Sequence, residues 1–353
     1  MEENRTAQQQ IAESTTRPLS DHQRKARRRE RIRKRRRQRE LLFLMALALV
    51  MVSLSAGYWF WRHRQLSLSS SSPQPTEPPV LTVTPDANAQ LVDDWQTTYR
   101  VMAHALGGID GKDYTNSLEA FMVNYAGGTR LFEIDLEITT DGKIALTHTW
   151  EDFSAMTGLE NRALSSEEFK SARIEGKYTP VLLEDLLQLM ETYRDFYVIV
   201  DSKRFDVEGT RMIYDLLLQE IDAVDPQLAH RFIPQAYNPD IYDTLDQEYD
   251  RFDDIIFTLY SYYVESDGQK IYQFVQDRHV PVVVMHMDND WAEKVITDIL
   301  AYAKQQQRED EFTIYIHTVN DMDKALNIIE EQGFFGVYSD FITEQQLQQA
   351  LAD

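Results

Sequence analysis

From residue 97 onward, short apolar runs of β-branched and aromatic residues alternate with segments of helical periodicity. The short runs predict strands, and the segments between most of them place apolar residues three and four positions apart, as amphipathic helices do. The predicted strands cover residues 100–105, 131–138, 143–148, 196–201, 230–235, 254–260, 281–286 and 312–317. The predicted helices cover residues 117–126, 181–193, 208–222, 239–248, 290–306 and 321–332.

This alternation over residues 97–353 predicts a (β/α)8 TIM barrel, an architecture of the α/β class. We expect the barrel to be irregular, because the run at 143–148 follows the run at 131–138 without room for a helix. An open, doubly wound sheet is the alternative. No glycine-rich phosphate loop of the Rossmann or Walker type follows a predicted strand, which disfavours that alternative and the nucleotide-binding functions associated with it.

A longer apolar segment precedes the predicted barrel. Residues 41–61 are 21 consecutive residues without a charge, and as a helix they would span about 31 Å, the thickness of a bilayer core. The segment is longer than the apolar part of a signal peptide, and no small-residue cleavage motif follows closely. It therefore predicts a single transmembrane helix that is retained as a signal anchor. Residues 62–96 are rich in Ser, Pro and Thr, a composition that predicts a disordered linker or stalk.

The net charge of −22 is divided unevenly along the chain. Residues 1–64 hold 16 lysines and arginines against 6 acidic residues, whereas the remainder holds 20 against 52. The basic run at residues 24–39 directly precedes the apolar segment, so the positive-inside rule predicts a cytoplasmic tail at residues 1–40 and an extracytoplasmic C-terminal domain at the cell membrane. Nucleic-acid binding by the basic run is the alternative. The acidic remainder disfavours it, and no nucleic-acid partner is expected.

The candidate chemistry begins with histidine, because the sequence contains no cysteine. Thiolate metal sites, disulfides and cysteine nucleophiles are thereby excluded, and any metal must bind oxygen or imidazole. Four of the eight histidines end predicted strands: His104, His148, His286 and His317. The C-terminal ends of barrel strands meet at one end of the barrel, where active sites form, so these histidines predict such a site. For any one of them, a packing role with a satisfied hydrogen bond is the alternative.

Two carboxylates lie on one predicted strand. Glu133 and Asp135 are two residues apart and therefore point to the same side of an extended strand. If that side is buried, their mutual repulsion calls for a hard divalent cation with oxygen ligands. A simple hairpin centred on Asp141 and Gly142 would place His148 opposite Asp135. The alternative is an ordinary solvated acidic strand face.

An ordered series of motifs then resembles a known family, the glycerophosphodiester phosphodiesterases of the phospholipase-C-like TIM-barrel superfamily. The resemblance runs from about residue 101 to residue 343 and makes the chain a divergent, membrane-anchored relative. The motifs are AHALGG, TNSLEAF, GTRLFEIDLEITTDGKIALTH, TPVLLEDLL, VDSK, IHTVN and GVYSDF.

The resemblance implies a metal-dependent phosphodiesterase that acts on glycerophosphodiesters or related lipid head-group phosphodiesters. It implies that His104 and His148 form the acid/base pair and that Glu133 and Asp135 bind a divalent cation, Ca²⁺ or Mg²⁺. It further implies that two residues of the VDSK motif occupy functional positions, Asp201 as a third metal ligand and Lys203 as a phosphate contact. The expected partner is a small-molecule or lipid-derived phosphodiester, with the membrane contacted through residues 41–61.

Three positions depart from the family pattern. Ala105 stands where an arginine usually follows the first histidine, Thr115 stands where a glutamate precedes Asn116, and Asp201 replaces a longer glutamate. These departures leave open a second function, in which a catalytically impaired barrel serves as a surface binding module.

Six further residues are interpreted as structural. Asn320 and Asp340 match the closing motifs of the family and are expected to support the fold. Trp150, Tyr237, Phe257 and Trp291 are expected to pack in the core or at its rim. Contact with a glycerol or lipid moiety at the end of the barrel is the alternative.

Overall fold

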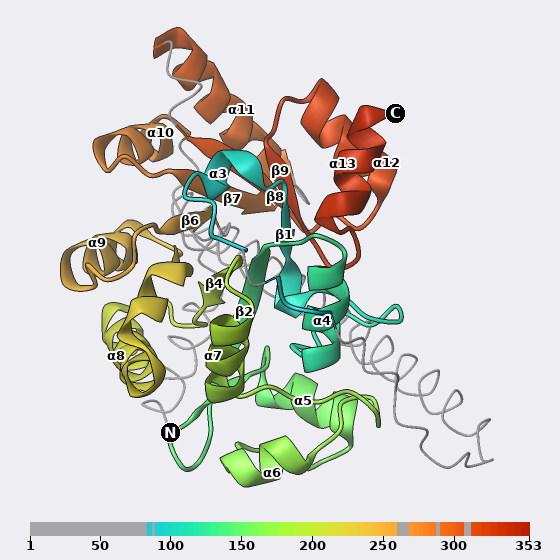
Figure 1. Ribbon diagram of the computed structural model, residues 1–353. Coiled ribbons are helices and arrows are strands. Elements are labelled where there is room, and N and C mark those ends of the chain that lie inside the picture. Colours follow the sequence, from blue (N-terminus) through green and yellow to red (C-terminus); the bar gives the residue numbers. More distant parts are fainter. Residues whose placement is uncertain (1–82, 87–88, 260–267, 287–289, 307–311) are drawn as a thin grey trace, which may run out of the picture. The chain divides into compact units, whose positions relative to one another are not determined.

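The computed structural model describes residues 83–86, 89–259, 268–286, 290–306 and 312–353 (Figure 1). The predicted transmembrane helix at residues 41–61 and the basic tail lie outside these ranges. None of the helices within them combines the length and the apolar character that crossing a membrane requires.

In the described part of the chain, eight parallel strands form a closed barrel. The wall follows the order β1–β9–β8–β7–β6–β5–β4–β2, and pairing of Met102 in β1 with Leu131 in β2 closes it. The predicted α/β barrel is therefore confirmed, and the open sheet is excluded. The wall strands are β1 (Val101–Ala103), β2 (Leu131–Ile138), β4 (Tyr197–Asp201), β5 (Phe232–Ala236), β6 (Ile256–Leu259), β7 (Val282–His286), β8 (Thr313–His317) and β9 (Gly336–Ser339).

The eighth wall strand is not the one that the sequence pattern suggests. The run at 143–148 forms β3 (Ile144–Leu146), which pairs antiparallel with the end of β2 and lies outside the wall. The place that it would have taken belongs to β9, whose four residues include only two apolar ones, Val337 and Tyr338, and so give no apolar run.

The predicted register of the β2–β3 hairpin is wrong by one residue. Leu136 pairs with Leu146, so that Asp135 faces Thr147, whose amide donates to the Asp135 carbonyl at 3.1 Å. The turn has three residues rather than two, with Gly142 in the left-handed conformation at φ +78°. His148 therefore follows the residue opposite Asp135.

Helices pack around the outside of the wall (Figure 1). The six predicted helical segments are confirmed, the last of them as α12 followed by a π-helical turn at Asn327–Glu331. Helices α10 and α13 were not predicted. The helices are α4 (Leu118–Ala126), α7 (Leu183–Thr192), α8 (Val207–Val224), α9 (Pro239–Glu248), α10 (Gly268–Asp277), α11 (Asp290–Gln306), α12 (Met322–Leu326) and α13 (Glu344–Ala352).

The barrel strands are buried on both faces, and alternate residues serve two separate cores. In β2, Phe132 and Ile134 point outward into the core between wall and helices. Leu131 points inward, where apolar side chains fill the barrel interior. The interior residues are Met102, Leu131, Tyr197, Ile199, Ile233, Ile256, Val282, Val284, Tyr315 and Tyr338.

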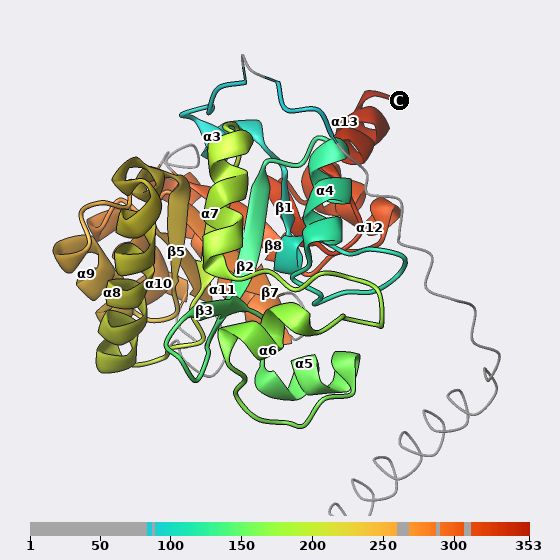
Figure 2. The same cartoon turned by 60° about the horizontal axis from the view of Figure 1, so that its bottom comes forward.

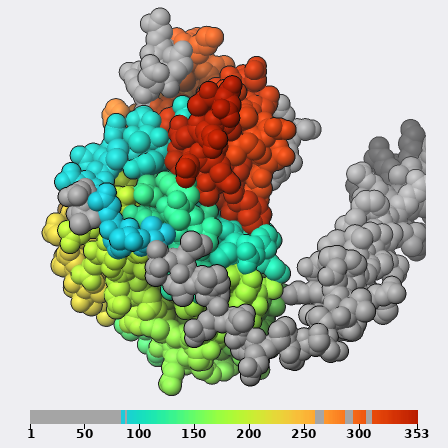
Figure 3. All heavy atoms as spheres, turned by 45° about the vertical axis from the view of Figure 1, so that its right-hand side comes forward, coloured from blue at the N-terminus to red at the C-terminus, as the bar shows by residue number. Residues whose placement is uncertain are grey.

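The short helix α3 (Trp95–Thr98) joins the same interior core. Trp95 is buried among the interior residues, and its indole N–H donates to Asp254 at 2.8 Å. Upstream, the Val83 carbonyl accepts from the Tyr193 hydroxyl at 2.9 Å. Figure 3 shows this cyan segment lying on the surface of the barrel domain. Contacts with the barrel thus begin N-terminal to residue 97.

Helices α5 (Trp150–Thr157) and α6 (Ser166–Ser171) form a small lobe after β3. They lie beyond the C-terminal end of β2, on the same side as β3 (Figure 2). The lobe has its own apolar core, which includes Phe153, Phe169 and Tyr178. This lobe positions the segment that carries His148.

Candidate active site

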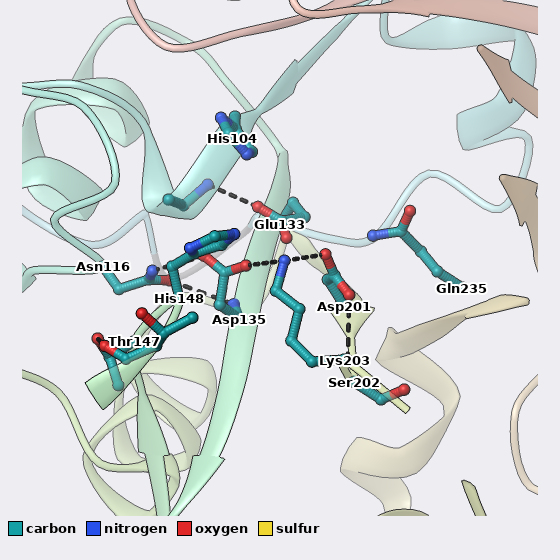
Figure 4. Close-up of polar contacts among 12 residues, drawn as sticks. His104, Asn116, Glu133, Asp135, Thr147, His148, Asp201, Ser202, Lys203 and Gln235 are labelled. Atoms are coloured by element: carbon teal, nitrogen blue, oxygen red, sulfur yellow. Dashed lines mark hydrogen bonds and ion pairs between the residues drawn. The ribbon is translucent and has the colours of Figure 1, made fainter. Parts of the chain in front are cut away.

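The inward-facing positions change from apolar to polar toward the C-terminal end of the barrel. Leu131 is followed at two-residue steps by Glu133 and Asp135, and Ile199 is followed by Asp201. The same alternation that packs the interior therefore aims polar groups into one end of the barrel (Figure 4). The polar residues that follow interior apolar residues in this way are His104, Glu133, Asp135, Asp201, Gln235, Thr258, His286, His317 and Asp340.

Three carboxylates converge at this end. Glu133, Asp135 and Asp201 are each at most 4% exposed, and each offers an oxygen within 4.8 Å of the others. Asp135 and Asp201 are register partners on the neighbouring strands β2 and β4. The structure thus brings together the three residues that the sequence assigned to a metal.

Lys203 lies among these carboxylates. Its ammonium contacts Asp135 Oδ1 at 2.7 Å and also pairs with Asp201, as Figure 4 shows. The Tyr237 hydroxyl donates a hydrogen bond to Asp201 as well. A single ammonium charge cannot compensate three carboxylates, and the ligand atoms around it are all oxygen. The set therefore fits a hard divalent cation.

The pKa values of the carboxylates reflect this excess of negative charge. Burial, together with the neighbouring Asp135, raises the pKa of Glu133 to about 8. For Asp135, burial acts in the same direction, but Lys203 and the nearby histidines hold its pKa below the ordinary value. Glu133 therefore stays largely protonated at neutral pH unless further positive charge, such as a divalent cation, lies nearby.

The segment after β1 supports the carboxylates from the other side. The amide of Ala105 donates to Glu133 Oε2 at 2.6 Å, and the Asn116 side-chain amide donates to Asp135 Oδ2 at 2.9 Å. Ala105 is fully buried. The Thr115 hydroxyl instead contacts Ser117 at 3.0 Å, so it is engaged within its own loop.

His104 is held by an aspartate. Its Nδ1 donates to Asp340 Oδ1 at 2.8 Å, which leaves Nε2 as the remaining ring nitrogen. Asp340 in turn accepts from the Asn320 side chain at 2.6 Å and donates its amide back to Asn320 Oδ1 at 2.8 Å. Asn320 and Asp340, expected only to support the fold, therefore also orient His104.

The same contacts set the protonation of His104. Burial would lower its pKa, but the bond to Asp340 and the charges of Glu133 and Asp135 outweigh burial and raise the pKa to about 9. The imidazolium form is thus favoured near neutrality.

His148 is held in a parallel way. Its Nδ1 donates to Asp152 Oδ2 at 2.7 Å, and the Thr149 hydroxyl donates to the same oxygen at 2.6 Å. The His148 side chain is one-third exposed, at 33%. The ring of Tyr114 lies between the two histidines, with centroids 4.5 Å from His104 and 4.9 Å from His148.

The other two strand-end histidines join the cluster. The His317 ring lies 4.9 Å from that of His104 and 4.2 Å from that of His286. Burial, followed by the charges of His104 and His286, lowers the pKa of His317 well below its ordinary value. The prediction that four histidines gather at one end is confirmed.

The predicted packing roles are confirmed for three of the four aromatic residues. Trp150 packs on Phe153 and Phe169, and both Phe257 and Tyr237 are buried in the core. The Tyr237 hydroxyl also contacts Asp201. The side chain of Trp291 lies outside the described part.

Three site residues were not named from the sequence, and Asp340 was named only as a support of the fold. Gln235 follows the two-residue inward alternation and could have been found from it. In Figure 4 the Gln235 amide nitrogen points toward the carboxylates. Asp152 and Tyr114 come from a helix and a loop, for which the strand alternation gives no signal.

Several solved structures share this barrel. A glycerophosphodiester phosphodiesterase from Parabacteroides distasonis is 16% identical with a TM-score of 0.53, over 72% of this chain and 96% of that one. A phosphodiesterase from Oleispira antarctica, in complex with the product sn-glycerol-3-phosphate, is 17% identical with a TM-score of 0.54, over 72% of this chain and 97% of that one. At such identities these likenesses show the fold.

A comparison with curated proteins returns no matching sequence. The model of the glycerophosphoryl diester phosphodiesterase family, in contrast, matches residues 108–344, which is two thirds of the chain. That range contains the carboxylates and His148, and it ends at the start of α13. The chain therefore belongs to the glycerophosphoryl diester phosphodiesterase family and is a phosphoric diester hydrolase.

Proposed function

We propose that this chain is a membrane-anchored, metal-dependent enzyme that hydrolyses glycerophosphodiesters or related lipid head-group phosphodiesters outside the cytoplasm. The observation that carries the proposal is a cluster of three buried carboxylates flanked by two histidines, each held by its own aspartate. Family membership supports the reaction class, and the glycerol phosphate bound by the Oleispira neighbour supports a glycerol phosphodiester as substrate.

Glu133, Asp135 and Asp201 would hold the cation, either Ca²⁺ or Mg²⁺. Their ligand atoms are all carboxylate oxygens, the donors that both ions prefer. A bound cation would offset the negative charge of the substrate phosphate. Lys203, at the edge of the same cluster, adds a second positive charge for a phosphate oxygen.

His104 and His148 would move the protons. Each donates its Nδ1 hydrogen to an aspartate, so each presents Nε2 to the substrate. One histidine takes the proton of the attacking water or hydroxyl as that oxygen bonds to phosphorus. The other gives its proton to the leaving alcohol oxygen as the second phosphorus–oxygen bond breaks. The proton count is balanced, since one proton is taken and one is given.

The location follows from the N-terminal sequence. The uncharged segment at 41–61 and the basic run before it support a single-pass anchor with a cytoplasmic N-terminus. Protease added to intact cells is expected to remove the barrel domain and to spare the N-terminal tail. Protection of the barrel domain would contradict this topology.

A substrate panel tests the enzymatic proposal. The full-length protein in detergent, with Mg²⁺ or Ca²⁺, is expected to release glycerol phosphate from glycerophosphocholine or a related diester. His104→Gln and His148→Gln are each expected to lower the turnover rate by about 10²- to 10⁴-fold.

His230→Gln is the matched control, because His230 also pairs with an aspartate, Asp253 at 2.9 Å, but on the exposed surface. Near-normal turnover in either active-site variant, with His230→Gln unchanged, would overturn the assignment of the two histidines.

A further inference from the structure

The segment between β1 and α4 holds five non-glycine residues with positive φ, and two of them, Tyr114 and Asn116, lie beside the carboxylates and histidines. Tyr114 has φ +53° and Asn116 has φ +43°. Residues other than glycine rarely adopt this backbone conformation, and they keep it where surrounding contacts impose it. Here the amide of Asn116 donates to the Ala105 carbonyl at 3.2 Å, and the amide of Gly108 donates to the Asp340 carbonyl. The loop is thus fastened to the ends of two barrel strands.

Asn116 has a visible partner at the site, whereas Tyr114 does not. The Asn116 amide contacts Asp135, as described above. The Tyr114 ring stands edge-on to both His104 and His148, with interplanar angles of 78° and 62°. Within the described residues, its hydroxyl makes no hydrogen bond. A half-buried phenol without a partner there is therefore held beside the two groups that would carry protons.

The charges around Tyr114 define what its hydroxyl can do. Burial, together with Asp135, Asp340 and Glu133, raises the pKa of Tyr114 well above its ordinary value. The hydroxyl therefore stays protonated and can donate a hydrogen bond in the working pH range.

Ala105 and its amide offer no donor to a phosphate bound between the two histidines. Position 105 carries a methyl group, which is fully buried, and the Ala105 amide is engaged with Glu133. Neither can donate to a substrate. Tyr114 borders the same space, and its hydroxyl hydrogen is available to an incoming oxygen.

We propose that Tyr114 is a substrate-binding residue whose hydroxyl donates a hydrogen bond to a phosphoryl oxygen of the diester. This inference rests on the proposed function for the position of the phosphate between His104 and His148. Tyr114 would thereby contribute at this site the phosphate contact that Ala105 cannot make. The ring, in contact with both imidazoles, would hold the hydroxyl in place.

Tyr114→Phe tests the proposal, because it keeps the ring and removes only the hydroxyl. Loss of one hydrogen bond to a charged phosphate is expected to raise the KM about 10-fold or more, with a much smaller change in kcat. Tyr178→Phe is the matched control. The Tyr178 hydroxyl donates to Asp110 of the same loop at 2.6 Å, away from the histidines. Its removal is expected to leave the KM unchanged.

Calorimetric binding of sn-glycerol 3-phosphate in the presence of Mg²⁺ separates this inference from the proposed function. If the wild type turns over no diester, the proposed function fails. Weaker binding to Tyr114→Phe than to the wild type would then still support the phosphate contact. Equal affinity of the two proteins, no binding to either, or an unchanged KM would overturn the role of Tyr114.

Discussion

Glu133, Asp135 and Asp201 owe their closeness to strand geometry, since β2 and β4 run in register and point them into the same space. Carboxylates so placed repel one another, and burial removes the water that would screen them. Lys203 relieves part of the repulsion. Because the rest of the repulsion is not relieved, we expect a divalent cation to bind among the three carboxylates.

Replacing one of these carboxylates is expected to weaken cation binding. Asp135→Asn keeps the shape of the side chain but removes a charged oxygen ligand, so its affinity for Ca²⁺ or Mg²⁺ should fall by about 10-fold or more, as measured by isothermal calorimetry. Glu137→Gln is the control, because Glu137 lies on the same side of β2 but outside the triad. Equal affinities of Asp135→Asn and Glu137→Gln would place the cation elsewhere.

Asp340 is expected to set the protonation of His104. Asp340→Asn keeps an oxygen that can accept from Nδ1 but removes one of the charges that, with Glu133 and Asp135, raise the pKa of His104 to about 9. We expect the limb of the pH–rate profile that reports the titration of His104 to move to lower pH. The rate loss should be smaller than the loss of about 10²-fold or more expected when a histidine is removed. A pH profile identical to that of the wild type would show that Asp340 is purely structural.

Among individual residues, the sequence could predict those that obey a periodic rule or belong to a motif. Glu133, Asp135, Asp201 and both proposed catalytic histidines were found in this way. Tyr114 was not, because its position depends on a left-handed backbone that tertiary contacts impose on a non-glycine residue. No local propensity predicts such a conformation for tyrosine.

Among the elements, the longer strands and helices were predictable, since their buried faces repeat at fixed spacing. The exceptions either contain few apolar residues or depend on which strand they pair with. The strand at 143–148 resembles a wall strand, yet a three-residue turn folds it back against β2. The true eighth strand, β9, has only four residues. Helix α13 begins at a capping box formed by Thr343 and Gln346, a signal that the sequence carries but that periodicity alone does not reveal.

The turn of the β2–β3 hairpin depends on one glycine. Gly142 has φ +78°, and no atom of the described residues lies within 4 Å of the place that an alanine Cβ would take. Gly142→Ala would therefore suffer backbone strain without a steric clash. We expect a loss of about 1 kcal/mol in the free energy of unfolding, measured by urea denaturation. Thr140→Ala, an exposed neighbour without positive φ, is the control. A Gly142→Ala protein as stable as the control would show that the turn adapts to an alanine.

For the molecule as a whole, stability is expected to depend jointly on pH and cation. The pKa of Glu133 is raised in the folded state from 4.5 to about 8, so its contribution to stability is fully present below pH 4.5. That contribution is lost as the pH rises through the folded-state pKa. His104, whose pKa is raised from 6.5 to about 9, loses its contribution in the same direction, between pH 6.5 and 9.

A cation binds the ionised carboxylates and should therefore restore part of the stability that the protein loses at alkaline pH. The increase in Tm on adding Mg²⁺ or Ca²⁺ is therefore expected to be larger at about pH 8 than at about pH 5, as thermal unfolding can measure. The chelated protein supplies the baseline at each pH. An increase that is equal at both pH values would argue against a cation on the carboxylate cluster.

We propose that the cation site at the C-terminal end of the barrel serves phosphodiester hydrolysis. The most direct test is the rate at which the full-length protein releases glycerol phosphate from a glycerophosphodiester, before chelation, after chelation and after divalent cation is restored. We predict turnover that disappears with the chelator and returns with Mg²⁺ or Ca²⁺. Turnover that is unaffected by complete removal of divalent cations would show that no cation takes part in the hydrolysis.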